Sequence, residues 1–199
     1  MNARPHRLLI AGACLAASAA ATAHTGTDGA LHHGFATGLA HPFTGIDHLI
    51  AMLAVGFASG VRGRGHSSVA WAAPLAFAAA LLIGALATAA GLGLPAIEPV
   101  VAASLLAFGL AIAMPGEVTL RVAVPIAAAF GVFHGAAHAQ ELAGADAFAG
   151  MLTGSIALLG LGFAGATATR LRREPWVRGV ATLTSALGFA LLAASLARV

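Results

Sequence analysis

The amino-acid sequence predicts an all-α, polytopic membrane protein with six transmembrane helices after a cleavable signal peptide. Three observations support this fold class. The 199 residues are 59% hydrophobic and only 9% charged, and their mean hydropathy is +0.91. Apolar runs of about 20 residues, which is enough to cross a bilayer, recur along the chain. These runs are rich in Ala, Leu and Gly and do not alternate polar with apolar residues, which favours helices over a transmembrane barrel.

Residues 1–23 have the pattern of a secretory signal peptide. A basic start precedes a short apolar run, and an Ala-Thr-Ala cleavage site ends at Ala23. Cleavage would remove Cys14 and leave His24 at the N-terminus of a six-helix transmembrane domain over residues 24–199. The alternative is an uncleaved first helix, although its apolar run is short for a membrane span.

Six apolar runs follow, joined by loops that are too short for a soluble domain. The predicted spans are Phe35–Ser59, Val69–Ala90, Ala96–Met114, Thr119–Ala143, Ala147–Thr169 and Val177–Ala197. The loops after the first, third and fifth spans hold seven arginines, whereas Arg198 is the one arginine on the other side. Because basic residues remain on the cytoplasmic side, the sequence predicts an inner-membrane protein with a periplasmic mature N-terminus.

The basic composition does not indicate a nucleic-acid partner. All ten basic residues are arginines, and they lie in short gaps between apolar runs rather than on a soluble face. A single cysteine excludes an internal disulfide and any multi-cysteine zinc site. The chain contains no G-x-x-x-x-G-K-[ST] motif, so the sequence does not predict an ATP-binding site of that type.

The fourth predicted span carries two histidines and a carboxylate within one apolar run. His134, His138 and Glu141 are spaced i, i+4, i+7, and Glu141 returns to within about 20° of His134 if the helix is continuous. Two imidazoles one helical turn apart can bind one metal ion, as in zinc protease helices. Cross-bundle hydrogen bonding is the simpler explanation for a lone histidine, but ionisable groups in lipid are costly and tend to be functional.

The first predicted span opens with a second polar cluster. His41, Asp47 and His48 lie around an interruption at Pro42-Phe43-Thr44-Gly45, where the helix either begins at a Thr44 N-cap or is broken. Met52 follows His48 by one turn and is either a thioether ligand or an ordinary packing residue. A broken helix at membrane depth frees backbone groups for ion binding.

Both polar clusters and Glu98, at the start of the third span, fall in the external half of the predicted bundle. Glu98 is either an entry-side ligand or a favourable partner of the helix dipole. His24, outside the bilayer, is a further candidate that would collect cations. Imidazole and carboxylate ligands without thiolates suit Ni²⁺, Co²⁺ or Zn²⁺ better than Ca²⁺ or Mg²⁺. The predicted metal ligands are therefore His24, His41, Asp47, His48, Met52, Glu98, His134, His138 and Glu141.

These motifs resemble those of the HupE/UreJ family of nickel/cobalt permeases. The segment from His41 to Met52 is similar to the family's H-P-x-x-G-x-D-H-x-x-x-M motif, and Phe133 to Glu141 is similar to its F-H-G-x-A-H-x-x-E motif. The resemblance implies a secondary permease that takes up Ni²⁺ or Co²⁺ as substrate and supplies urease or hydrogenase, without enzymatic activity or a resident cofactor. It also relates Ser104 in the third span to a polar position of the family. Ala139 departs from a glycine that family members often have.

Two other function classes remain open from the residues alone. An intramembrane zinc hydrolase would use the same histidines and carboxylates to activate a water molecule, but it would need a lipid-sized cleft and a general base. A metal sensor or assembly subunit would need a sizeable cytoplasmic module, for which the short loops leave no room. The sequence does not rank nickel, cobalt and zinc.

Overall fold

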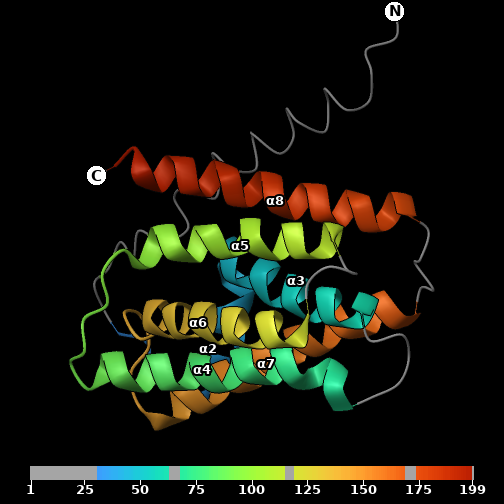
Figure 1. Cartoon of the computed structure of the whole chain (residues 1–199). Coiled ribbons are helices and arrows are strands. Elements are labelled where there is room, and N and C mark those ends of the chain that lie inside the picture. Colours follow the sequence, from blue (N-terminus) through green and yellow to red (C-terminus); the bar gives the residue numbers. More distant parts are fainter. Residues whose placement is uncertain (1–30, 63–67, 115–118, 169–173, 199) are drawn as a thin grey trace, which may run out of the picture.

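A computed structural model describes residues 31–62, 68–114, 119–168 and 174–198, which form a bundle of helices (Figure 1). The predicted signal peptide and His24 lie outside the described residues. Within them the structure has no β-strand, which confirms the all-α class. The helices are α2 (Phe35–Thr44), α3 (Ile46–Arg62), η1 (Ser68–Trp71), α4 (Ala72–Ala89), α5 (Ile97–Ala113), α6 (Leu120–His138), α7 (Ala145–Ala168) and α8 (Glu174–Leu196).

The helices occupy the positions of the six predicted apolar runs. Four segments are long and apolar enough to cross a membrane: Val69–Ala89, Leu120–His138, Ala145–Ala168 and Pro175–Leu196. The pair α2–α3 passes the same test as one bent segment, and α5 is a shorter apolar helix. Its 17 residues span about 25 Å, somewhat less than a bilayer core. The chain is therefore a multi-pass membrane protein with four or five candidate spans in its described part, while the predicted count of six stays a prediction.

Large apolar side chains cover the outside of the bundle. Leu75 and Ile83 of α4, Leu161 of α7, and Leu183 and Phe189 of α8 are all more than half exposed. In water such a surface would be an aggregation site, whereas in a bilayer it contacts acyl chains. The outward-facing leucines and phenylalanines thus agree with a membrane environment.

The helices pack in three groups. In the first group α7 packs against α2 and α3, in the second α4 packs against α6, and in the third α5 packs against α8 (Figure 1). Glycines allow the close approach of α4 and α6, because a Cβ at Gly135 would overlap the carbonyl of Leu81 and one at Gly84 would overlap the carbonyl of Val132. Small residues at such contacts are typical of membrane helices, whose association depends on packing.

The first predicted span is broken, and its two halves differ in direction by 83°. The expected interruption is confirmed, because α2 ends at Thr44 and α3 begins at Ile46 with extended backbone at Gly45 between them. Thr44 is not the N-cap of α3: its hydroxyl donates to the carbonyl of His41, at 2.7 Å, and so completes the end of α2. The carbonyl of Gly45 accepts the first hydrogen bond of α3, from Leu49.

The fourth predicted span is shorter than expected at its end. We predicted helix as far as Ala143, but α6 ends at His138. The chain then turns toward α7 through Gly144, whose positive φ of 92° suits glycine. The backbone of residues 141–143 pairs with His32, which donates to the carbonyl of Glu141 and accepts from the N–H of Ala143. The continuous helical stripe that we predicted from His134 to Glu141 is therefore wrong at Glu141.

Candidate metal pocket

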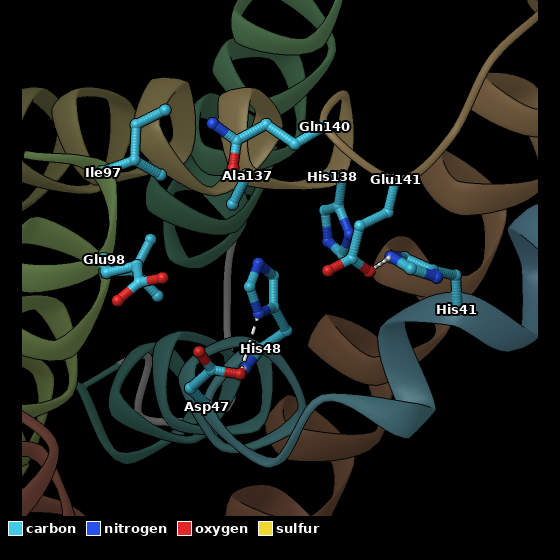
Figure 2. A pocket seen from close by; sticks show the side chains of 10 residues that line it. His41, Asp47, His48, Ile97, Glu98, Ala137, His138, Gln140 and Glu141 are labelled. Atoms are coloured by element: carbon cyan, nitrogen blue, oxygen red, sulfur yellow. Dashed lines mark hydrogen bonds and ion pairs between the residues drawn. The ribbon is translucent and has the colours of Figure 1, made fainter. Parts of the chain in front are cut away.

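A partly open pocket lies where the start of α3, the start of α5 and the end of α6 meet (Figure 2). Its volume is about 50 Å³. The lining residues are His41, Asp47, His48, Ile97, Glu98, Val101, Ala137, His138, Gln140 and Glu141. The fold thus brings six of the nine predicted ligands to one pocket, although they come from segments about 100 residues apart in the chain.

Four imidazole rings form a continuous row beside this pocket. The ring centroids of His41 and His138 are 5.0 Å apart, those of His138 and His48 are 4.2 Å apart, and those of His48 and His134 are 4.8 Å apart. The row runs inward, because the His41 side chain is 13% exposed whereas His134 is fully buried. The two sequence motifs therefore interleave, with each ring touching one from the other motif.

Asp47 orients the His48 ring. Its Oδ1 lies 2.9 Å from His48 Nδ1 and accepts a hydrogen bond from the His48 backbone N–H at 2.8 Å (Figure 2). A carboxylate that accepts the Nδ1–H of a neutral imidazole leaves the lone pair on Nε2, the atom that then binds a metal. This carboxylate–histidine pair is the arrangement found behind many metal ligands. Asp47 thus contributes through His48 as well as through its own position in the pocket wall.

A polar contact between His41 and Glu141 joins α2 to the turn after α6. The Nε2 of His41 lies 3.1 Å from Oε2 of Glu141, whose side chain is 32% exposed (Figure 2). Although the helix ends before Glu141, the turn still directs its carboxylate to the pocket. The carboxylate therefore lies beside the outermost ring of the row, with access to solvent.

His138 is the buried ring with the greatest unused binding capacity. It is 2% exposed, and among the described residues neither Nδ1 nor Nε2 has a hydrogen-bond partner. Buried polar groups are nearly always hydrogen-bonded, and an exception calls for an explanation such as a ligand or an ion. Because His138 also lines the pocket, its ring nitrogens are strong candidates for metal ligation.

His134 lies deeper than the pocket wall and is positioned by Ser104 of α5. The Ser104 hydroxyl donates to the carbonyl of Val101 at 2.6 Å, so its oxygen is available to accept a hydrogen bond from Nε2–H of His134, 2.9 Å away. This geometry places the Nε2 proton and leaves the lone pair of a neutral ring on Nδ1. Ser104 was indicated from the sequence by family resemblance alone, since no residue pattern links it to His134.

The remaining predicted ligands differ in position. Glu98, in the first turn of α5, is exposed at the pocket rim. Met52 is fully buried in the hydrophobic core and is not among the residues that line the pocket, which agrees with the packing alternative. Gln140, the residue before Glu141, also lines the pocket (Figure 2). Ile97 and Val101 were missed because apolar lining residues have no sequence signature.

The pocket is not arranged as a finished coordination site. Within the described part of the chain, no group of three or more His, Cys, Asp or Glu side chains is placed to hold a metal ion. The contacts explain this, because His48 faces Asp47 and His41 is paired with Glu141. Ion binding at these residues would therefore require their side chains to rotate.

Comparison with known proteins decides the family. Residues 12–191 match the family described as HupE / UreJ protein, which is most of the chain. This chain belongs to the HupE/UreJ family. It is 33% identical over 160 residues to Protein HupE of Rhizobium leguminosarum bv. viciae, covering 76% of this chain and 80% of that protein. No solved structure gives a significant match. The family membership that the two motifs predicted is thus confirmed over most of the chain.

Proposed function

We propose that this HupE/UreJ protein is a secondary permease that takes up Ni²⁺, with Co²⁺ as a second substrate, across the inner membrane and supplies urease or hydrogenase. The observation that carries the proposal is the single pocket shared by both histidine motifs. It combines three imidazoles, three carboxylates and a carboxamide at one end of a membrane bundle. The permease does not require an enzymatic step, and the metal ion is its cargo.

Capture begins at the rim. Glu98 and Glu141 are the accessible carboxylates of the pocket, and their negative charge attracts a hydrated cation. A volume of about 50 Å³ has room for only a few water molecules. An octahedral hydrated ion carries about six waters, so it must exchange most of them for side-chain ligands before it enters.

His48 and His138 are the principal ligands in this proposal. The rings are neighbours, the Asp47 contact presents Nε2 of His48, and both nitrogens of His138 are available. His41 and Glu141 complete the set when the ion replaces the contact between them. His134 would receive the ion next, since its ring follows His48 in the inward row.

The ligand chemistry favours a borderline transition metal. Imidazole suits Ni²⁺, Co²⁺ and Zn²⁺, whereas Ca²⁺ and Mg²⁺ prefer oxygen-only sites. Metal binding requires unprotonated imidazoles, so protons and the metal ion compete for the pocket. This competition provides a route to proton-coupled release without any further cofactor.

The pocket does not favour the alternative of an intramembrane zinc hydrolase. Such an enzyme needs space beside the metal for a lipid or a peptide, and a volume of about 50 Å³ is far below the several hundred cubic ångströms of ordinary substrate sites. Of the three carboxylates that could accept a proton, Asp47 is engaged in orienting His48, and Glu141 lies against His41. Transport uses all of the observed features without a substrate cleft.

Radioactive-nickel uptake tests the proposal. Cells that express the wild-type chain should accumulate nickel above empty cells, and an excess of unlabelled Co²⁺ should reduce the uptake. His48→Ala should lose at least about 90% of this uptake, because removal of a ligand costs tenfold or more in affinity. Equal uptake by wild-type and His48→Ala cells would exclude the proposed role of His48.

A matched control separates ligand loss from misfolding. His66→Ala also removes a histidine, but from a loop between predicted spans, and it should leave uptake unchanged. Wild-type uptake no higher than that of empty cells, together with lipid or peptide cleavage by the purified protein, would instead favour the hydrolase.

A further inference from the structure

A second pocket lies at the opposite end of the same helices. It is formed by the end of α3, the end of α5 and the start of α6, and its volume is about 170 Å³. Among its lining residues are Val55, Ser59, Arg62, Phe108, Ala111 and Ala127. The wall is almost entirely apolar, so the guanidinium of Arg62 is its dominant charge.

Buried rings connect the histidine row to this second pocket. The rings of His134 and Phe77 are 5.3 Å apart, and those of Phe77 and Phe108 are 6.1 Å apart. Phe108 itself lines the second pocket. Because α3, α5 and α6 line both pockets, the two cavities and the rings between them lie along one axis of the bundle.

Arg62 links two helix groups at the second pocket. Its Nη2 donates to the carbonyl of Ala111 at 2.6 Å, and its Nη1 donates to the carbonyl of Ala58 at 3.2 Å. Ala111 belongs to the last turn of α5, where carbonyls lack intrahelical partners and the helix dipole is negative. The side chain therefore joins α3, which packs on α7, to α5, which packs on α8.

We propose that the second pocket is the exit half of the ion path and that Arg62 is the gate residue that closes it. This inference rests on the transport function proposed above. A guanidinium repels a divalent cation in an apolar cavity, as arginines do in cation-excluding pores. Release of Arg62 from Ala111 would remove the charge from the path and let the α3 and α5 groups separate.

The volumes agree with this order of events. The second pocket, at about 170 Å³, has room for several more water molecules than the histidine pocket, at about 50 Å³. An ion that sheds its water among the histidines can therefore regain water beyond Phe108. Polar contacts between helix groups occur at both ends, namely His41 with Glu141 and Arg62 with Ala111, as alternating access requires.

Thiol labelling in the full chain tests the gate independently of nickel. Cys14 is the only natural cysteine, so Cys14→Ser with Ser59→Cys carries one reporter in the second pocket. Inverted membrane vesicles are treated with cationic and anionic membrane-impermeant methanethiosulfonates. Arg62→Gln should increase the labelling rate about tenfold with both reagents. The gate proposal would be overturned if Arg62→Gln left the labelling rates unchanged. It would also be overturned if the variant reacted faster with the cationic reagent and more slowly with the anionic one.

Controls distinguish gating from loss of charge or of folding. Arg121→Gln removes an exposed arginine at the same end and should leave labelling unchanged. Arg62→Lys keeps the charge but loses the forked donor, and its labelling rate should lie between those of the wild type and Arg62→Gln. It replaces the glutamine variant in the test if that variant does not accumulate in the membrane. Normal nickel uptake, with a labelling rate that does not change when Arg62 is substituted, would refute the gate proposal alone. No nickel uptake in any variant, with a labelling rate that still depends on Arg62, would refute nickel as the substrate and support the gate proposal.

Discussion

The pair of Asp47 and His48 yields the sharpest quantitative prediction. Asp47→Asn keeps the size of the side chain. It also keeps an oxygen that can accept a hydrogen bond from the backbone N–H of His48, which lies 2.8 Å from Oδ1 of Asp47 in the structure. It removes the charge that holds Nδ1–H, 2.9 Å away. The substitution therefore weakens the orientation of the ring while leaving the start of α3 hydrogen-bonded.

The expected effect on metal binding is larger than the effect on stability. Loss of a carboxylate behind a metal-binding histidine costs about 10- to 100-fold in affinity, or roughly 1.4 to 2.7 kcal/mol. Loss of one negative charge in the first turn of a helix costs only about 0.3 to 1 kcal/mol. The nickel concentration for half-maximal uptake by Asp47→Asn should thus rise at least about tenfold, with little change in thermal unfolding of the purified protein.

A double-mutant cycle tests whether Asp47 acts through His48. If it does, adding Asp47→Asn to His48→Ala should cause little further loss, because the ring that Asp47 orients is already absent. Titration calorimetry of the purified variants with Ni²⁺ measures the affinities directly. Unchanged affinity in Asp47→Asn, or fully additive losses in the double variant, would refute the reasoning.

Four other predictions follow from named contacts. Gly135→Ala should lower the free energy of unfolding by about 1 to 3 kcal/mol, because the new methyl group would overlap the backbone of α4. Gly160→Ala should leave it unchanged, because a methyl group there meets nothing within 4 Å. Ser104→Ala should raise the half-maximal nickel concentration about tenfold, while Ser155→Ala, whose hydroxyl bonds its own helix, should leave it unchanged. Met52→Leu should retain nickel uptake, since a buried packing residue tolerates an isosteric change. Abolished uptake in a correctly inserted variant would instead favour the interpretation of Met52 as a thioether ligand. Uptake at a fixed nickel concentration should fall as the medium is acidified, because protons compete with the metal ion for imidazole and carboxylate ligands; a rise on acidification would contradict histidine ligation.

Much of the candidate site could be predicted because the ionisable residues are so few. In an apolar chain with 9% charged residues, His48, His138 and Glu141 stand out without any structural information. Topology alone placed them at one end of the bundle, and the fold brings them to one pocket. The pattern did not distinguish His134, which lies behind the wall, from His138, which lines it, because both occupy one helical stripe.

Other features depend on contacts between elements that no local pattern encodes. The hydrogen bond from His134 to Ser104 joins residues 30 positions apart, and the pair of Arg62 with Ala111 joins residues 49 positions apart. The position of Glu141 depends on the end of α6 and on the pairing of the next turn with His32. Met52 has the same helical spacing as a ligand would have, yet it lies in the core.

The sequence by itself determined the helical membrane class, the interruption between Pro42 and Gly45 and the identity of most pocket residues. Hydropathy, proline and glycine chemistry and the cost of charge in lipid act locally, so they can be read along the chain. The tertiary structure alone decided the 83° direction of the break, the interleaved row of imidazoles and the pocket at the far end beside Arg62. These features arise where three helix groups meet, and that meeting depends on the packing of glycine-containing faces remote from one another in the chain.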